Sequence, residues 1–274
     1  MKRTILCSYR NNNTLFCRKS TEDPVANTPT AHIYWEMILL NAGDMVYTVN
    51  GKEYHLCKNN LVITRPLDYH ALSFASEETY DRYLIVFSED SLISNVCKEI
   101  PPDLDIIDLN GYDHILSLFR KMSHYIEQFD PQTVNTLLVY MIEEILYNAI
   151  VISKKSKETE LRSVNPVIRE ALQYINENIT RQITLEELAD HLHLTKGHIC
   201  KLFTNHLNTS PKQFILSQKL LMAKKDLYAG SKVTEVCTKY SFSDYSGFYR
   251  HYMHRYGHKP SDTAAFASLE NDGF

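Results

Sequence analysis

Residues 184–203 of the chain read TLEELADHLHLTKGHICKLF, and residues 233–252 read VTEVCTKYSFSDYSGFYRHY. The two stretches resemble each other, because Ala189 matches Cys237 and Phe203 matches Tyr252. The separation is 48 residues at the first pair and 49 at the second, so the second copy has one extra residue at its turn. In each copy, apolar residues at helical spacing are interrupted once, which predicts two short helices joined by a turn.

Each copy has the local features of a helix-turn-helix unit. Thr184 and Glu187 predict a capping box at the start of the first helix in the first copy. Thr195 and Ser243 are placed to cap the second helix of each copy. That second helix has apolar residues on one side only, so its polar side can enter a DNA major groove.

One long helix is expected between the two copies, over residues 211–227. Pro211 suits a first helical position, and apolar residues follow at helical spacing. A helix of about seventeen residues spans roughly 25 Å. It would hold the second helices of the two copies at a separation suited to successive major grooves on one DNA face, about 34 Å apart.

The last hundred residues contain further recognisable positions around these two copies. They are Ser210-Pro211, Lys219-Leu220 followed by Ala223 and Leu227, and residues 240–256 closed by Gly257-His-Lys-Pro260-Ser261. On these residues the segment resembles the AraC/XylS family of transcription regulators. The resemblance implies a sequence-specific regulator without catalytic residues that binds double-stranded promoter DNA, with RNA polymerase as a further partner.

The second helix of each copy supplies the expected DNA contacts. The resemblance implies Gly197, Cys200 and Lys201 in the first, and Ser246, Gly247, Tyr249 and Arg250 in the second. Lys196, His198 and Tyr245 lie on the same polar sides. Arg250 suits a bidentate contact with guanine, and Lys201 suits a guanine or a phosphate. We therefore expect the second unit to discriminate bases and the first to position the protein on DNA.

The charge distribution agrees with a DNA-binding C-terminal part. The net charge is −4, yet residues 164–268 contain 13 Lys and Arg against 9 Asp and Glu, whereas residues 1–163 contain 16 against 22. A basic segment attached to an acidic one is typical of nucleic-acid binding. The alternative is an all-α protein-binding domain whose polar helix faces are simply solvated.

Residues 1–110 are expected to be β-rich. Short apolar or alternating runs are separated by turn signals, and Asn50-Gly51 is a strong two-residue hairpin signal. Strands this short favour a small barrel or sandwich. The runs are Ile38–Leu40, Met45–Val49, Leu61–Thr64 and Arg82–Phe87.

Helical periodicity begins after Gly111 and predicts a helical segment over residues 111–153. A second helix in it is expected to start at Asp130-Pro131, and its apolar stripe is wide. The stripe indicates packing on the barrel or, in addition, pairing with a second subunit. Residues 154–163 are polar and charged, which predicts a linker to the DNA-binding domain at residues 164–268.

Residues 30–87 contain His32-Ile-Tyr34-Trp-Glu36, Gly43, Pro66 and His70. On these positions the segment resembles the cupin-type effector domain that is often joined to such DNA-binding domains. The expected fold class is therefore α+β: a cupin-like β-barrel at residues 1–110, a helical dimerisation segment, and an all-α domain with two helix-turn-helix units. The resemblance implies that His32, Tyr34, Glu36 and His70 bind a small-molecule effector, for example a sugar.

Three interpretations of these polar residues stay open. They bind a small polar molecule, they are satisfied polar groups at strand ends, or they form part of a metalloenzyme. His32, Glu36 and His70 resemble three of the four ligands of a metal-binding cupin, and two imidazoles with a carboxylate suffice for a transition metal. The sequence does not decide whether they bind metal, and it identifies no cofactor. A cupin metalloenzyme with a fused helical domain is the alternative to a regulator.

Several classes of protein are disfavoured by the remaining composition. The six cysteines are scattered without a Cys-x-x-Cys pair, which argues against a zinc ribbon or a disulfide scaffold. The N-terminal residues lack the apolar run of a signal peptide. The apolar stretch 136–152 contains Glu143 and Glu144, so we expect no membrane span. These features predict a cytoplasmic protein, and the helical segment at residues 111–153 predicts a homodimer.

Overall fold

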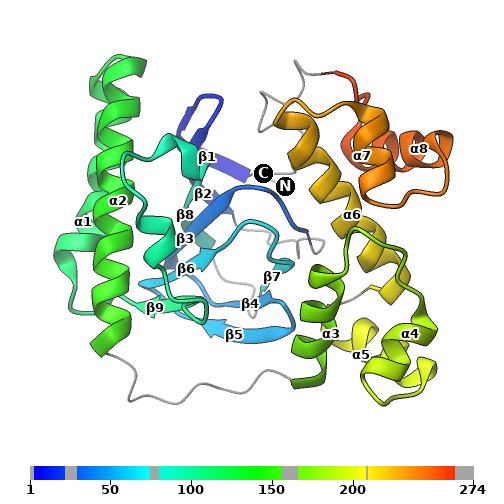
Figure 1. The fold of residues 1–274 in the computed structure, drawn as a ribbon. Coiled ribbons are helices and arrows are strands. Elements are labelled where there is room, and N and C mark those ends of the chain that lie inside the picture. Colours follow the sequence, from blue (N-terminus) through cyan, green and yellow to red (C-terminus); the bar gives the residue numbers. More distant parts are fainter. Residues whose placement is uncertain (1–2, 22–29, 75–79, 156–165, 208, 263–274) are drawn as a thin grey trace.

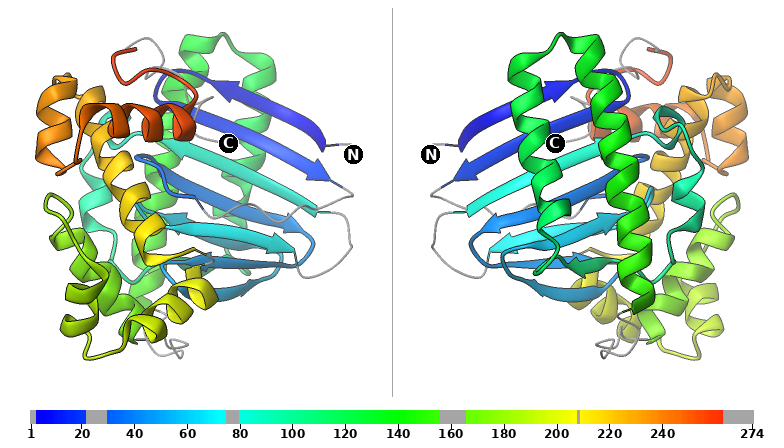
Figure 2. Two further views of the ribbon diagram at one scale, coloured as in Figure 1. Left: turned by 90° about the vertical axis from the view of Figure 1, so that its right-hand side faces the viewer. Right: turned by 90° about the vertical axis from the view of Figure 1, so that its left-hand side faces the viewer.

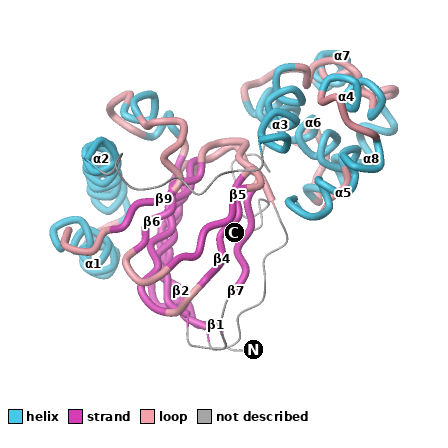
Figure 3. Tube along the Cα trace, turned by 90° about the horizontal axis from the view of Figure 1, so that it is seen from below, coloured by secondary structure: helices cyan, strands magenta, loops and turns pink. Residues whose placement is uncertain are grey.

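The computed structural model describes residues 3–21, 30–74, 80–155, 166–207 and 209–262. Within these residues the chain forms a β-rich N-terminal domain, two long helices packed on it, and a C-terminal helical domain (Figure 1). Viewed from below in Figure 3, the strands lie between the pair α1 and α2 on one side and the C-terminal helices on the other. Residues 156–163 of the linker predicted at 154–163 lie outside the described residues.

The strands form two antiparallel sheets that face each other across an apolar core. The expected closed barrel is not what the described strands form, because they make two open sheets. The large sheet has the order β1 (Arg3–Arg10), β2 (Thr14–Thr21), β8 (Tyr80–Phe87), β3 (Trp35–Ala42), β6 (Asn60–Thr64) and β9 (Ile106–Asp108), and the small sheet has the order β5 (Lys52–Leu56), β4 (Met45–Val49) and β7 (His70–Phe74).

The hairpin predicted at Asn50-Gly51 is confirmed. Val49 pairs with Lys52, and the two turn residues have φ angles of 48° and 78°. Positive φ at both central positions gives the turn the twist of its strands. The four apolar runs named above are confirmed as parts of β3, β4, β6 and β8.

The outer face of the large sheet is covered by α1 (Asp113–Gln128) and α2 (Pro131–Lys155), which lie side by side in Figure 2. The predicted start of α2 is confirmed, because the Asp130 carboxylate accepts from the backbone N–H groups of Gln132 and Thr133. By length and hydropathy α2 could cross a membrane, but 56% of that window is buried inside the protein. Two short 3-10 helices, η1 (Glu89–Ser91) and η2 (Val96–Glu99), precede β9.

The C-terminal domain contains the two expected helix-turn-helix units joined by a long helix. The Thr184 side chain accepts from the Glu187 N–H and so begins the first unit at the predicted residue, whereas the Glu187 carboxylate, predicted to complete a capping box, accepts from Tyr174 Oη. The helices are α3 (Pro166–Glu177), α4 (Leu185–His191), α5 (Lys196–Leu207), α6 (Pro211–Tyr228), α7 (Val233–Lys239) and α8 (Tyr245–Tyr256). The units are α4 with α5 and α7 with α8, and α6 connects them.

The N-terminal caps of α5 and α8 differ. Thr195 Oγ1 accepts from the His198 N–H at 3.3 Å at the start of α5, as predicted. The prediction that Ser243 caps α8 is wrong, because the N-cap is Asp244, whose Oδ1 accepts from the Gly247 N–H at 2.6 Å. The extra residue in the second turn brings a carboxylate to the cap, where its charge also suits the helix dipole.

A buried lysine ties the two units to the connecting helix. Lys219 on α6 is 7% exposed, and its Nζ donates to the carbonyls of Arg181 and Tyr240 at 2.8 Å each. Arg181 precedes α4, and Tyr240 ends α7. One ammonium therefore fixes a chain segment of each unit relative to α6.

Candidate functional site

The polar side of α5 is open to solvent. Ile199 and Phe203 are fully buried and anchor the helix. Of the residues predicted to contact DNA, Lys196, Gly197, His198 and Lys201 are exposed and Cys200 is half-buried. Lys196 forms an ion pair with Glu186, which partly neutralises the Lys196 charge. Lys201 is therefore the main cation that this helix presents.

The polar side of α8 is presented in the same way. Phe248 and Tyr252 anchor the helix in the core. Tyr245, Ser246 and Arg250 are exposed, and Gly247 and Tyr249 are half-buried. Arg250 Nε lies 3.4 Å from the Ser246 carbonyl one turn earlier, so the guanidinium lies along the helix.

The beginning of α8 also has a defined electrostatic environment. The N–H of Gly247, together with the Ser243 hydroxyl and the Arg250 charge, lowers the pKa of Asp244. A Cβ on Gly247 would lie 3.2 Å from Asp244 Oδ2, which is tighter than ordinary contact. Glycine at this position therefore lets the capping carboxylate approach the backbone closely.

A second polar cluster lies between the two sheets and joins three of the four residues predicted to bind an effector. His32, Glu36 and His70 are 2%, 5% and 5% exposed. Glu36 Oε2 lies 3.6 Å from His32 Nε2, and Glu36 Oε1 lies 3.6 Å from His70 Nε2. Glu36 belongs to the large sheet and His70 to the small sheet, so the cluster bridges them.

Burial and mutual contact shift the ionisation of this cluster. Burial raises the pKa of Glu36, but the contacts with His32 and His70 outweigh it and bring the pKa to about 2. Burial lowers the pKa of His70 to about 4, against the opposing attraction of Glu36. At neutral pH the cluster therefore holds a carboxylate beside a neutral His70 imidazole.

Tyr34, the fourth predicted residue, lies beside this cluster and contacts it through its main chain. Its backbone carbonyl lies 3.0 Å from His32 Nδ1 and orients that ring. Its side chain is buried in the apolar core between the sheets, with Ile38 and Leu40. The residue positions the cluster through its main chain.

Three neighbours of the cluster were not predicted from the sequence. Tyr47 packs with its ring centroid 6.1 Å from that of His70, and its hydroxyl bonds to Thr64. Burial raises the pKa of Tyr80 to about 12, and Arg82 interacts electrostatically with both Tyr80 and Glu36. The signal that could have found Arg82 is strand parity: it pairs with Leu40, on the face that Glu36 shares.

The chain is similar to known transcriptional activators. A helix-turn-helix domain family model matches residues 188–265. The lactose operon transcription activator of Staphylococcus xylosus is 21% identical over 239 residues, covering 85% of this chain and 84% of that protein. A XylDLEGF operon transcriptional activator of Pseudomonas putida is 22% identical over 251 residues, covering 86% and 76%.

A solved structure described as a probable AraC family transcriptional regulator from Rhodopseudomonas palustris is 30% identical to this chain. It aligns with 38% of this chain and 98% of its own, with a TM-score of 0.35. With its helix-turn-helix match and its similarity to these transcriptional activators, the chain belongs to the AraC/XylS family of transcription regulators. It is a DNA-binding transcription regulator, and the exposed sides of α5 and α8 lie in its helix-turn-helix units.

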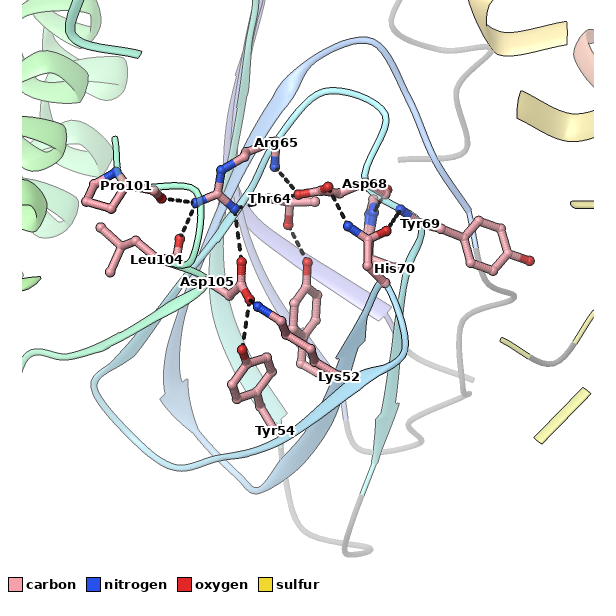
Figure 4. Close-up of polar contacts among 12 residues, drawn as sticks. Lys52, Tyr54, Thr64, Arg65, Asp68, Tyr69, His70, Pro101, Leu104 and Asp105 are labelled. Carbon is pink, nitrogen blue, oxygen red and sulfur yellow. Dashed lines mark hydrogen bonds and ion pairs between the residues drawn. The ribbon is translucent and has the colours of Figure 1, made fainter. Parts of the chain in front are cut away.

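The two domains of the regulator share an apolar contact. Tyr69 is 9% exposed, and its ring meets that of Phe214 on α6 edge to face, with centroids 5.2 Å apart. Its hydroxyl interacts with Thr209. Figure 4 shows Tyr69 directed away from Asp105 and toward the C-terminal helices. Ala31 joins the same cluster, with Ile33 and Leu67 packed against it.

The tip of the β4–β5 hairpin forms a second part of this contact. A Cβ on Gly51 would lie 2.7 Å from Ile168 Cγ2 on α3, so the turn and the helix touch. Asn50 holds the adjoining loop, because its Nδ2 donates to Asp68 at 2.6 Å and its Oδ1 accepts from the Tyr69 N–H at 3.0 Å. Hairpin and loop therefore approach the C-terminal domain as one unit.

Proposed function

We propose that the regulator changes its DNA binding when a small molecule occupies the cluster of His32, Glu36 and His70, next to Tyr34. The observation that carries this proposal is that side chains along two backbone segments face alternately the polar cluster and the C-terminal domain. In the first, His32 faces the cluster whereas Ala31 and Ile33 pack with the C-terminal domain. In the second, His70 faces the cluster whereas Leu67 and Tyr69 pack with the C-terminal domain.

This alternation gives a physical route between the two sites. A ligand that moves either histidine must move the neighbouring residues on the other side of the same backbone. Those residues lie in the core that also contains Phe203 of α5 and Phe214 of α6. A ligand shifts the equilibrium between two arrangements only if it binds one of them better, so the effector must prefer one domain arrangement.

On the DNA side, the proposed contacts are those predicted from the sequence: Lys196, Gly197, His198, Cys200 and Lys201 on α5, and Tyr245, Ser246, Gly247, Tyr249 and Arg250 on α8. Their exposure and the burial of the opposite helix faces support this assignment. Lys201 and Arg250 are the strongest candidates, since each is an exposed cation on the outward side of its helix. RNA polymerase as a further partner and a cytoplasmic location belong to the same proposal.

A homodimer through α2 is also part of the proposal. Tyr140, Tyr147 and Val151 are 58%, 42% and 51% exposed at helical spacing on its outer side. An exposed apolar stripe on a long helix can pair with the same stripe of a second copy. Sedimentation of the wild type and of a Tyr147→Glu variant tests this, and a monomeric wild type would remove this part of the proposal.

The main experiment combines site selection with an effector screen. Genomic fragments bound by the purified regulator define its site, and the dissociation constant for that site is then measured against salt and against candidate sugars. Log affinity should fall steeply with log salt, because bound phosphates release counterions. An effector should shift affinity in the wild type and not in Tyr69→Ala. If no small molecule changes DNA affinity or promoter output, effector control is wrong.

A further inference from the structure

The turn between β6 and β7 holds Leu67 in a strained conformation. The Asp68 N–H donates to the Arg65 carbonyl at 3.1 Å, which closes a β-turn over residues 65–68. Leu67 occupies the third position of this turn with a φ of 75°, where glycine or asparagine is the usual residue. Among the described residues it is the only aliphatic side chain with a φ in the left-handed region. A residue stays in such a conformation only when the contacts around it hold it there.

Arg65 holds the turn from one side. Its guanidinium donates to Asp105 Oδ1 at 2.9 Å, as Figure 4 shows. It also donates to the main-chain carbonyls of Pro101 and Leu104. The backbone N–H of Arg65 donates to Asp68 Oδ2 at 3.1 Å, at the opposite end of the turn. Because a guanidinium has its donors in fixed directions, these bonds set the position of the turn relative to the segment before β9.

Asp105 joins this arrangement to the β4–β5 hairpin. Asp105 is 4% exposed, and its Oδ2 accepts from Lys52 Nζ and Tyr54 Oη at 2.8 Å each. A buried carboxylate needs such donors, since an unpaired charge is costly to bury. Asp68 accepts in turn from Asn50 at the tip of the hairpin. The turn and the hairpin both contact the C-terminal domain, and one network of charges and hydrogen bonds connects them.

The C-terminal domain lies on the other side of the turn. Leu67 packs against the apolar core of that domain, and Tyr69, just after the turn, contacts Phe214. The Leu67 N–H donates to the His32 carbonyl at 2.8 Å, so the turn also fixes the segment before β3. The strained residue is therefore held between the Arg65 network and the contact between the domains.

We infer that Arg65 is a positioning residue for the DNA-binding domain, because together with Asp105 it holds the turn in the strained form against which that domain docks. Without the guanidinium, Leu67 relaxes to a negative φ and its contact with the C-terminal core is lost. This inference rests on the proposed function for its regulatory meaning, since it names the element that changes when the two domains change their arrangement. Strain in the turn favours release of the docked arrangement, so the Arg65 network sets how strongly an effector must prefer one arrangement.

The test is amide hydrogen exchange of the full chain, measured by mass spectrometry at residues 66–72 and at residues 213–219 of α6. Arg65→Gln should speed exchange in both segments by at least about 10-fold, because loss of a hydrogen bond from a charged group makes local opening easier by this factor or more. Arg65→Lys keeps the charge but cannot reproduce the planar set of donors, so it should have a smaller effect.

The matched control is Arg18→Gln. Arg18 also bonds a carboxylate through two nitrogens, at 3.2 and 2.7 Å from the Asp81 oxygens, but between β2 and β8. This variant should leave exchange in both segments at the wild-type rate. Exchange in residues 213–219 that Arg65→Gln leaves unchanged, or that Arg18→Gln raises as much, overturns the inference.

Two substitutions of Leu67 test the strain itself. Leu67→Gly and Leu67→Ala both remove the apolar contact, but only alanine retains a Cβ at a positive φ. Glycine is ordinarily the less stable of the two in a folded chain, whereas here Leu67→Gly should melt higher than Leu67→Ala by roughly 2–4 °C. A melting temperature of Leu67→Gly at or below that of Leu67→Ala contradicts the strained turn and overturns the inference.

DNA affinity measured with candidate effectors separates this inference from the proposed function. Faster exchange in Arg65→Gln, with no small molecule that changes the DNA affinity of the wild type, supports the positioning role and contradicts effector control. Unchanged exchange in Arg65→Gln, with a small molecule that does change wild-type DNA affinity, supports effector control and overturns the positioning role.

Discussion

Tyr69 of the β-rich domain and Phe214 of α6 meet edge to face, with an angle of 78° between their rings. Tyr69 directly precedes His70, whose imidazole faces Glu36 in the interior. Consecutive residues of an extended chain point to opposite sides. One peptide unit therefore separates a buried polar cluster from the core of the DNA-binding domain.

Replacing this ring should weaken the contact between the domains. Tyr69→Ala is expected to cost about 3 kcal/mol, at the low end for loss of a buried aromatic side chain. The variant should uncouple the unfolding of the two domains. Calorimetry should then change from one unfolding transition in the wild type toward two in the variant. Tyr69→Phe keeps the ring pair and should behave nearly as the wild type. A single transition at the wild-type temperature in Tyr69→Ala would show that the contact contributes nothing.

Comparing Gly51→Ala with Gly111→Ala separates the cost of backbone strain from the cost of disturbing the contact between the domains. The residue has a φ of 78°, and the added Cβ would lie 2.7 Å from Ile168 Cγ2. The matched control is Gly111→Ala, where φ is 85° and no heavy atom lies within 4 Å of the added Cβ. Both variants should lose roughly 1–2 kcal/mol from left-handed backbone strain. Gly51→Ala should lose a further 1–3 kcal/mol from overpacking, measured by urea unfolding.

If Gly51→Ala and Gly111→Ala lower the free energy of unfolding equally, the hairpin does not contact α3 closely in solution. A larger loss in Gly111→Ala would contradict the argument from the added Cβ altogether.

Local signals were enough to predict the parts of the fold that depend on neighbouring residues. The Asn50-Gly51 turn, the Thr184 cap and the start of α2 after Asp130 each depend on a few adjacent side chains. The cap of α8 was misassigned because Ser243 and Asp244 are both good caps, and only the length of the turn decides between them.

Relationships between distant segments were harder to predict. A closed barrel and two open sheets contain similar short strands, and the pairing of β9 with β6 cannot be read from local periodicity. The resemblance to cupins brought His32, Glu36 and His70 together correctly, but not Tyr47 or Arg82. Tyr47 and Arg82 lie beside the cluster because of the register in which β4 and β8 pair with their neighbours.

Lys219 is expected to hold the two helix-turn-helix units in place. Lys219→Met removes the ammonium and leaves the carbonyls of Arg181 and Tyr240 without this donor. The expected loss is about 2–4 kcal/mol, because hydrogen bonds from a charged donor are strong and buried acceptors are costly to leave unsatisfied. DNA affinity should fall as well, since the separation of α5 and α8 would no longer be fixed. Unchanged stability and unchanged DNA affinity in Lys219→Met would exclude this role.

Arg250 and Lys201 should affect DNA binding in different ways. Arg250→Ala is expected to relax specificity at one base position and to cost roughly 1–3 kcal/mol on the selected site. Lys201→Ala should weaken binding more uniformly across sequences and reduce the salt slope by about one, as expected for a lost phosphate contact. Lys121→Ala on α1 removes an exposed charge from the other domain and serves as the control. If Arg250→Ala lowers affinity equally for all sequences, the residue binds phosphate, and base discrimination by α8 must come from Tyr249 or Ser246.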